Sequence, residues 1–317
     1  AQWHQYRALQ REQAAFANRL LLQVNVDDDK NSFTLNNVRR PPPHLSEVLN
    51  FAMTHTTEQK FVMPLRELLG MIGAHQWYQK GVFIPPLQAT IHPHYGVFAP
   101  IRSDYWTLLV DDRTIPSPLN KDDAVVLMDV GIGTGVLSAL LCQKQQITRL
   151  VGTDKNPAAL SCARDNWNRL GLNVPLELHE THLFPDDPVQ ADWIICNPPW
   201  LPDDVANSWL DRAVYDDVEY AVLRGFLAGA KRSLKPNGEV WLVLSDLAEL
   251  LGLRTRVQLM QWIDDGNLQV VEIHSITQAH RKTTKTKGKK KKGTSEFDLI
   301  EAARAAETTS LYRLRFK

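Results

Sequence analysis

The chain has 317 residues and a formal net charge of zero, with 44% hydrophobic and 23% charged residues, as is ordinary for a globular protein. No stretch approaches the roughly 18 unbroken apolar residues of a membrane helix. Charged side chains interrupt the first twenty residues, which excludes a typical secretion signal. The three cysteines lack metal-binding or redox spacing and are interpreted as reduced core residues. We therefore expect a cytoplasmic protein that has no membrane partner.

Residues 1–82 are predicted to form a small, mainly helical domain. Apolar side chains recur at helical spacing over the first twenty residues. Ser46 is expected to cap a short helix that continues through Ala52. Pro64 suits the first turn of another helix, over residues 65–72, which Gly73 would end. This pattern predicts packing and indicates no chemistry.

Residues 83–115 are predicted to be a connector, because they are rich in proline, histidine and aromatic residues. His92 and His94 flank Pro93 within it. Two histidines without a third ligand at a suitable spacing do not predict a metal site. We therefore expect no metal in this protein.

From residue 116 to residue 317 the chain alternates between short apolar runs and helical segments. The runs predicted to be strands are residues 124–130, 150–153, 176–178, 193–196, 240–244, 270–276 and 311–316. The last of these alternates and would pair at the end. Helices are expected to follow the first two strands. This alternation predicts an α/β catalytic domain, a doubly wound, mostly parallel seven-stranded sheet of Rossmann-like type.

A glycine-rich turn follows the first predicted strand, at Asp129-Val-Gly131-Ile-Gly133-Thr-Gly135. Ligands of such sheets bind beyond the carboxyl ends of the strands, and glycines let the backbone approach a ligand closely. Asp129 at the strand tip can accept a hydrogen bond from an ammonium group. A dinucleotide fingerprint counted from Gly131 would need glycine at 136, where the chain has Val136. The turn therefore favours a cofactor without a pyrophosphate.

Asp154 ends the second predicted strand. A carboxylate at this position can accept hydrogen bonds from both ribose hydroxyls, as in nucleotide-binding folds. The same role occurs in enzymes that bind NAD, so Asp154 indicates an adenosine-containing ligand without choosing among them. The alternative is that Asp154 only caps the following helix.

A stiff loop, Asn197-Pro198-Pro199-Trp200, follows the fourth predicted strand. Both prolines fix φ and lack N–H groups. The side-chain oxygen of Asn197 and the carbonyl of Pro198 can both accept from one planar NH2 group, which would orient its nitrogen toward a methyl group held over the glycine turn. Trp200 would stack on the planar group. The alternative is a proline-rich strand exit with a packing tryptophan.

With these three motifs, residues from about 95 to 317 resemble a class I S-adenosylmethionine-dependent methyltransferase of the Asn-Pro-Pro-aromatic group. This group contains N6-adenine methyltransferases of DNA and RNA, related ribosomal RNA methyltransferases and release-factor glutamine methyltransferases. The resemblance implies S-adenosylmethionine as the cofactor. It also implies cofactor-binding roles for the acids and glycines above, and acceptor-binding roles for Asn197, Pro198 and Trp200.

Two further residues enter only through this resemblance. It implies that the segment from Gly96 to Pro100, with Phe98 at its centre, helps to cover the cofactor. The family often has an acid after the third strand, in a pattern like Ser-Asp-Leu-Phe, that holds the adenine amino group. This chain departs from the pattern with Thr-His-Leu-Phe, so His182 or a neighbour would serve.

The methyl acceptor is left open by the motifs, because adenine and the glutamine amide both present a planar NH2. Residues 281–292, from Arg281 to Lys292, carry eight basic and no acidic side chains. Removing these eight charges from a net charge of zero leaves −8 on the rest of the chain. The loop is predicted to leave the sixth strand on the active-site side, where it would attract ribosomal or transfer RNA. Its alternative is a solvated lysine-rich loop.

We therefore expect an N-methyltransferase that acts on a base in RNA, adenine N6-like, with a protein glutamine as the alternative acceptor. Two other classes stay open. A nicotinamide-dependent oxidoreductase would be stabilised by NAD and not by S-adenosylhomocysteine. A catalytically silent RNA-binding module would lose RNA when the basic segment is deleted and would transfer no methyl group.

Overall fold

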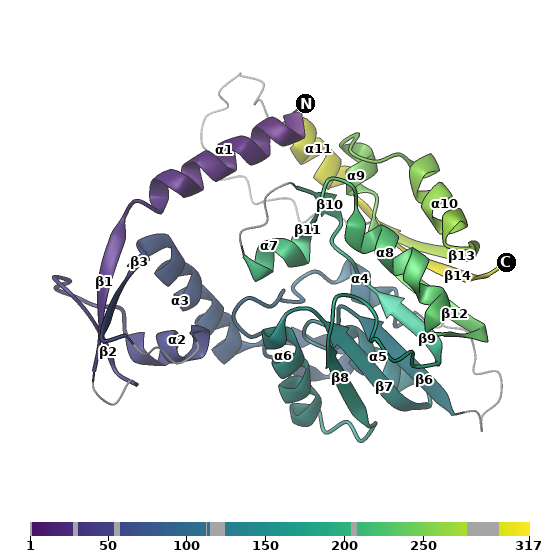
Figure 1. Ribbon diagram of the computed structural model, residues 1–317, viewed down its shortest axis with the longest axis horizontal. Coiled ribbons are helices and arrows are strands. Elements are labelled where there is room, and N and C mark those ends of the chain that lie inside the picture. The colour runs from purple at the N-terminus through teal and green to yellow at the C-terminus, as the bar shows by residue number, and fades with distance from the viewer. Residues whose placement is uncertain are drawn as a thin grey trace. The chain divides into compact units, whose positions relative to one another are not determined.

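The computed structural model (Figure 1) describes residues 2–27, 31–53, 58–111, 113–114, 124–203, 208–277 and 298–317. The chain divides into two compact units. One consists of Ala1–Val82 with His92–Gly96, and the other of Phe83–Ile91 with Val97–Lys317. No helix in the described ranges is both long and apolar enough to cross a lipid bilayer.

The first unit combines three helices with a small antiparallel sheet. The helices are α1 (Gln2–Ala17), α2 (Leu45–Ala52) and α3 (Leu65–Lys80). The sheet has the order β2-β1-β3, with β1 at Leu21–Val26, β2 at Phe33–Leu35 and β3 at Lys60–Pro64. Val24, Leu49 and Leu68 are buried in the core between sheet and helices. The unit is small and helical as predicted, but the sequence did not predict its sheet.

Two helix boundaries in this unit differ from the predictions. α2 begins after His44, which adopts a left-handed φ of 58°, and the Ser46 hydroxyl instead accepts a hydrogen bond from the backbone N–H of Phe33 at 2.9 Å. Ser46 therefore ties the helix to the sheet. α3 continues through Gly73 to Lys80 and ends at Gly81, where φ is 69°. Gly73 does not stop the helix, because the cost of one interior glycine is small beside the packing of a buried helix face.

The second unit contains a seven-stranded sheet of order β13-β14-β12-β9-β6-β7-β8. Its strands are β6 (Val125–Val130), β7 (Ile147–Asp154), β8 (Leu176–Glu180), β9 (Ala191–Cys196), β12 (Leu234–Ser245), β13 (Leu268–Thr277) and β14 (Thr308–Phe316). All pairs from β12 to β8 are parallel. The predicted Rossmann-like fold is confirmed.

Helices follow most of these strands (Figure 1). They are α4 (Asp104–Thr107), α5 (Val136–Lys144), α6 (Pro157–Arg169), α7 (Trp209–Val214), α8 (Ala221–Gly229), α9 (Leu247–Leu250), α10 (Arg256–Asp265) and α11 (Asp298–Ala306). α6 packs against β7 and β8, whereas α8 packs against α10, and α10 against β13. Short elements complete the unit: β4 (Val82–Ile84), η1 (Pro85–Leu87), β5 (Ala89–Ile91), β10 (Leu201–Pro202), β11 (Tyr215–Asp216) and η2 (Ala230–Arg232).

The last strand occupies an unexpected position in the sheet. β14 does not pair at the end, but lies between β12 and β13 and is antiparallel to both. Its burial explains this place, because the run from Thr309 to Arg313 is buried throughout. The predicted direction of β13 holds, since two antiparallel steps leave β13 parallel to β12.

The central strands of the sheet are buried on both faces. β6 and β9 bury nearly all of their side chains, as expected for strands covered on both faces. The rings of Trp193 on β9 and Trp241 on β12 stack with centroids 5.0 Å apart. This core holds the carboxyl ends of β6, β7 and β9 in one fixed register.

Candidate active site

Three motifs meet at the carboxyl edge of the sheet because of that register. Val130, the last residue of β6, pairs with Thr153 on β7 and with Cys196 on β9. The next residue along each strand is therefore Gly131, flanked by Asp154 on one side and by Asn197 on the other. Neighbouring strands lie about 4.8 Å apart. The glycine turn, the acid and the Asn-Pro-Pro-Trp loop thus border one small region.

The turn after β6 has a backbone that requires glycine. Gly131, Gly133 and Gly135 have φ values of 77°, 53° and 78°. A Cβ added to Gly131 would meet no atom within 4 Å, so this position faces open space. The N–H groups of Gly131 and Ile132 both donate to the carbonyl of Thr153, at 2.8 and 2.9 Å. The turn is consequently held against β7, while Gly131 is exposed and Gly133 partly exposed to a ligand.

Asp129 lies beneath this turn and is almost completely buried. Its Oδ2 accepts a hydrogen bond from the hydroxyl of Ser138, in the first turn of α5, at 2.5 Å. Burial raises the pKa of Asp129 to about 7, and the charge of Asp154 adds to the rise against the hydrogen bonds from Ser138. The site therefore places a poorly solvated carboxyl group below the turn.

Asp154 ends β7 as predicted and uses both carboxylate oxygens locally. Oδ2 accepts from the N–H of Gly133 at 3.0 Å, and Oδ1 accepts from the N–H of Asn156 at 2.9 Å. Burial raises its pKa despite these hydrogen bonds. The cap of α6 is Asn156, whose side chain accepts from the N–H of Ala158. Asp154 therefore shapes the glycine turn and is not itself the helix cap.

The two acids suit a ligand that carries positive charge and hydroxyl groups. Neither Asp129 nor Asp154 forms an ion pair with another side chain in the described ranges, and both have a raised pKa. A nearby cation would relieve this unfavourable pairing of carboxyl groups. S-adenosylmethionine carries a sulfonium, an ammonium and two ribose hydroxyls. The two acceptor carboxylates and the exposed Gly131 of the turn fit this cofactor.

Asn197, which follows β9, is partly exposed, whereas Pro198 is buried. The Asn197 Oδ1 atom accepts a hydrogen bond from the indole Nε1–H of Trp200 at 2.8 Å. An amide oxygen has two acceptor sites, so one remains for another donor. The loop therefore presents Asn197 with its amide orientation already set by Trp200.

Trp200 makes a second contact that the sequence did not predict. The guanidinium of Arg102 lies over the indole ring, with Cζ 4.9 Å from the ring centroid. Arg102 is bound in turn by the buried carboxylates of Asp104 and Glu307. Only one face of Trp200 is therefore left for the predicted stacking on a planar acceptor, and that role stays a prediction.

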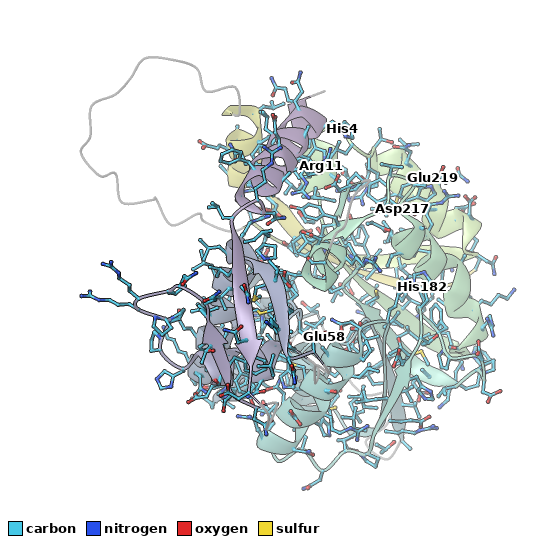
Figure 2. The ribbon with its side chains drawn as sticks, turned by 60° about the vertical axis from the view of Figure 1, so that its left-hand side comes forward. His4, Arg11, Glu58, His182, Asp217 and Glu219 are labelled. Carbon is cyan, nitrogen blue, oxygen red and sulfur yellow. The ribbon has the colours of Figure 1, made fainter. Side chains whose placement is uncertain are left out.

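The two residues taken from the family resemblance also lie in the second unit. Phe98 is half-buried, and its neighbour Val97 packs against Ala159 and Cys162 of α6. His182 is exposed and follows β8 (Figure 2), two residues after Glu180, which pairs with Asp154. His182 is therefore at the carboxyl edge of the sheet, and Phe98 is next to a residue that packs on α6. Their contacts with a cofactor remain predictions.

Acidic side chains lie near the Asn-Pro-Pro-Trp loop. β10, just after Trp200, pairs with β11, and the exposed Asp217 and Glu219 follow β11 (Figure 2). The carboxylate of Asp217 accepts from the N–H groups of Glu219 and Ala221 at the start of α8. The basic segment from Arg281 to Lys292 lies outside the described residues.

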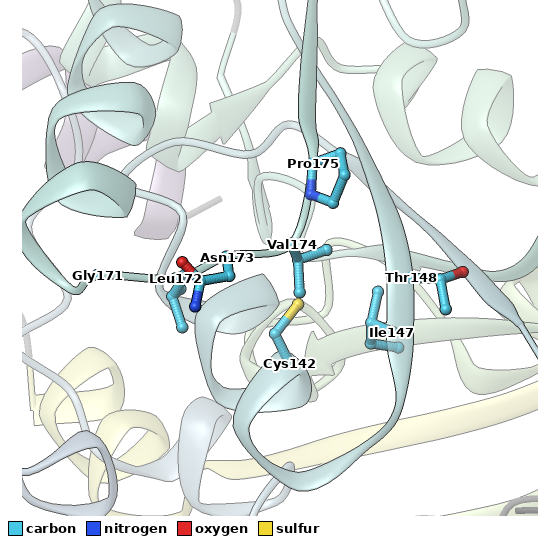
Figure 3. Close-up of a pocket in the computed structure, with 8 residues that line it drawn as sticks. All are labelled: Cys142, Ile147, Thr148, Gly171, Leu172, Asn173, Val174 and Pro175. Carbon is cyan, nitrogen blue, oxygen red and sulfur yellow. The ribbon is translucent and has the colours of Figure 1, made fainter.

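A hollow of about 500 Å³ opens at the opposite edge of the sheet (Figure 3). It is lined by the end of α5, by the start of β7 and by the segment between α6 and β8, including Cys142, Ile147 and Pro175. Burial raises the pKa of the Cys142 thiol to about 12, so the thiol stays protonated at neutral pH. Because the hollow lies at the amino ends of the strands, it is separate from the candidate site.

Comparison with known proteins shows the family of this chain. Residues 88–258 match the family model described as the methyltransferase small domain. A protein of Methanocaldococcus jannaschii, named provisionally as a protein N5-glutamine methyltransferase, is 31% identical over 52% of this chain and 79% of its own. The release factor glutamine methyltransferase of Cereibacter sphaeroides is 28% identical over 47% and 59%. The tRNA1(Val) (adenine(37)-N6)-methyltransferase of Shewanella halifaxensis is 27% identical over 43% and 61%. The chain thus spans about three-fifths of the last two relatives.

Proposed function

We propose that this chain, which belongs to the methyltransferase small domain family and is an S-adenosylmethionine-dependent methyltransferase, acts on a planar NH2 group. The nitrogen of that group would be held by Asn197 and Pro198. The observation that carries the proposal is the register of β7, β6 and β9. It places Asp154, Gly131 and Asn197 side by side at one edge of the sheet. A cofactor bound over the glycine turn and an acceptor bound at the loop would be neighbours.

The residues of the chain perform binding and alignment in this proposal. S-adenosylmethionine supplies a methyl group on a sulfonium, which a nitrogen lone pair can attack directly. The carbon–sulfur bond would break as the carbon–nitrogen bond forms, S-adenosylhomocysteine would leave, and the methylated nitrogen would then lose one proton to water. The remaining acceptor site of Asn197 Oδ1 and the carbonyl of Pro198 would each accept a hydrogen bond from one N–H of the NH2 group. These two hydrogen bonds direct the nitrogen lone pair toward the turn. Alignment of this kind accounts for large rate effects without a covalent intermediate.

Asn197→Ala tests the proposed role of the loop. We expect cofactor binding to stay nearly unchanged while methyl transfer falls by about two to four orders of magnitude. Binding of S-adenosylhomocysteine by calorimetry and transfer from labelled S-adenosylmethionine measure the two effects. Equal losses in both measurements would show that Asn197 is only structural.

An RNA base is the first candidate acceptor. The sequence of residues 281–292 concentrates eight positive charges, which would attract a polyanion. One relative is named for adenine-37 of a transfer RNA. Methylating a paired base would require unstacking it, at roughly a few kcal/mol, so a base in an exposed loop is the expected target.

A glutamine side chain of a protein is the second candidate acceptor. Two relatives are named for glutamine methylation. The exposed acids Asp217 and Glu219 follow β11, which pairs with the strand just after Trp200. They would repel a polyanion at this side of the site. A protein acceptor would not meet that repulsion.

Labelled S-adenosylmethionine with separated cellular RNA and protein fractions distinguishes the two acceptors. Label in RNA that disappears on deletion of residues 285–292 supports the RNA base, and label in a protein band supports glutamine. Asn197→Ala is the control in both fractions. Cofactor binding without transfer to either fraction would overturn the enzymatic proposal and favour a silent RNA-binding module.

A further inference from the structure

Trp200 is held from two sides by side chains of the second unit. Its indole N–H donates to Asn197 Oδ1 at 2.8 Å, and one ring face contacts the Arg102 guanidinium at 4.9 Å. The first contact fixes which way the Asn197 amide points. The second contact fixes the plane of the indole. Together they connect the proposed acceptor-binding oxygen to a residue almost one hundred positions earlier in the chain.

Arg102 is itself held by two carboxylates, one at the start of α4 and one between α11 and β14. Its Nε and Nη2 donate to Asp104 Oδ1 and Oδ2 at 3.1 and 2.5 Å, and its Nη1 donates to Glu307 Oε1 at 3.0 Å. Asp104 is 1% exposed and Glu307 is 5% exposed. Planar, bidentate pairing of this kind leaves the guanidinium little freedom to turn.

The two carboxylates are anchored to the sheet in their turn. The hydroxyl of Thr309 on β14 donates to Asp104 Oδ2 at 2.5 Å, and the hydroxyl of Ser245 at the end of β12 donates to Glu307 Oε1 at 2.6 Å. Burial alone would raise the pKa of Asp104, but hydrogen bonds from Arg102 and Thr309 outweigh it and lower that pKa. Asp104 is therefore ionised and bound to Arg102 at neutral pH. The network is a rigid connection between the sheet and Trp200.

We infer that Arg102 is a positioning residue of the methyl-transfer reaction, acting through Trp200 on the amide of Asn197. It holds the indole so that its N–H occupies one acceptor site of Asn197 Oδ1 and leaves the other directed at the substrate NH2. Without this hydrogen bond the amide could rotate, and its NH2 group would then face the acceptor nitrogen and repel its protons. This inference rests on the proposed function of Asn197.

The main test compares Arg102→Met and Trp200→Phe. Methionine keeps much of the length of the arginine side chain and removes the guanidinium, whereas phenylalanine keeps an aromatic ring and removes the indole N–H. We expect each variant to lower the single-turnover rate of methyl transfer by about tenfold to a hundredfold, with cofactor affinity unchanged. Because both changes break one chain of contacts, the double variant should lose no more than either single variant.

Arg256→Met is the matched control. Arg256 also lies over an aromatic ring, that of Tyr312, at 5.7 Å, and its Nε donates to Glu249 at 2.9 Å. Within the described part of the chain Arg256 contacts neither Trp200 nor Asn197, so its loss should leave the transfer rate unchanged. Arg102→Lys should recover only part of the rate, since an ammonium cannot reproduce the bidentate, stacked geometry. The inference would be overturned if the rate loss in the double variant equalled the product of the losses in the two single variants. An unchanged rate in Arg102→Met would also overturn it.

A spectroscopic measurement decides the inference even if no acceptor is found. The chain has nine tryptophans, so ¹⁵N-labelled indoles give nine N–H signals, and Trp200→Phe identifies the one from residue 200. We expect Asn197→Leu and Arg102→Met each to shift that signal and speed its exchange with solvent, and Arg256→Met to leave it unchanged. An unshifted Trp200 signal in Arg102→Met would refute the connection between the two residues. Absence of any methyl transfer by the wild-type protein would instead count against the proposed function alone.

Discussion

The backbone N–H of Gly133 donates a hydrogen bond to the carboxylate of Asp154 at 3.0 Å, so the acid that ends β7 shapes the turn that follows β6. The same carboxylate accepts from the N–H of Asn156 through its other oxygen. A carboxylate has about four acceptor sites, so these backbone donors leave part of its capacity for a ligand. Asp154 can therefore order the glycine turn and bind hydroxyl groups of a ligand at the same time.

Asp154→Ala should weaken cofactor binding more than it slows the transfer step. We expect the Kd for S-adenosylhomocysteine to rise at least about tenfold, because a charge-assisted hydrogen bond to each of two hydroxyls and the support of the turn are lost together. Calorimetric titration measures the change. Asp187→Ala, at an exposed acid in the loop between β8 and β9, is the control and should bind normally. An unchanged Kd in Asp154→Ala would contradict the proposed ribose contact.

Asp129 should make the stability of the cofactor-free protein depend on pH. Burial and the charge of Asp154 raise its folded-state pKa to about 7, above its unfolded value of about 3.9. The folded state thus binds the proton more tightly. Its favourable contribution is complete below about pH 4 and is lost as the pH rises toward 7.

Asp129→Asn removes this titration and keeps the size of the side chain. We expect the variant to become more stable relative to the wild type between pH 4 and pH 8, by an amount on the order of a few kcal/mol. Urea unfolding at a series of pH values measures this difference. A constant difference across the range would mean that Asp129 is already ionised at low pH in the folded protein.

Glu239 should contribute strongly to the stability of the sheet. It is 2% exposed and accepts from Nε and Nη2 of Arg313, both at 2.9 Å, as well as from Nε1 of Trp241 at 3.0 Å. Glu239→Ala would leave the buried Arg313 guanidinium with Glu272 as its remaining carboxylate partner, at a cost of about 1.5–3 kcal/mol in the free energy of unfolding.

The exposed pair of Glu177 and Arg149 provides the control for Glu239. Both side chains are at least 40% exposed, so Glu177→Ala should cost less than about 1 kcal/mol. Chemical denaturation of both variants measures the contrast. If the two substitutions lowered the free energy of unfolding by similar amounts, burial of the Glu239 carboxylate would not explain its contribution to stability.

Gly152 should be required for close packing beneath the glycine turn. A Cβ at this position on β7 would collide with Cδ1 of Ile132 and lie 2.8 Å from Cδ2 of Leu178. Gly152→Ala is expected to lower the free energy of unfolding by about 1–3 kcal/mol and to weaken cofactor binding by displacing Ile132. Thermal unfolding and calorimetry measure the two effects.

Gly73→Ala is the opposite case and serves as the comparison for Gly152. Gly73 lies within α3, and a Cβ there would meet no atom within 4 Å. Alanine should therefore stabilise this helix by about 0.5–1 kcal/mol. A destabilised Gly73→Ala variant would mean that the position has a packing role that its surroundings do not indicate.

Most of the second unit could be predicted from local patterns. β6, β7 and β9 are recognisable because strands buried on both faces are continuous apolar runs. The glycine turn, Asp154 and Asn197 lie at the ends of such runs, so predicting the strands also predicts that these residues lie at the strand ends. The small sheet of the first unit was missed, because its strands are short and β1 pairs with β3 far along the sequence, as in the pair Leu21 and Pro64.

By itself, the sequence determined the kind of fold, the family and the segments that carry the chemistry, because these depend on periodicity and on short motifs within single elements. Only the tertiary structure decided that β14 lies inside the sheet, that Gly131 is flanked by Asp154 and Asn197, and that Arg102 lies over Trp200. These are contacts between residues that are distant along the chain. They depend on strand order and register, which the packing of the whole core selects and no local pattern records.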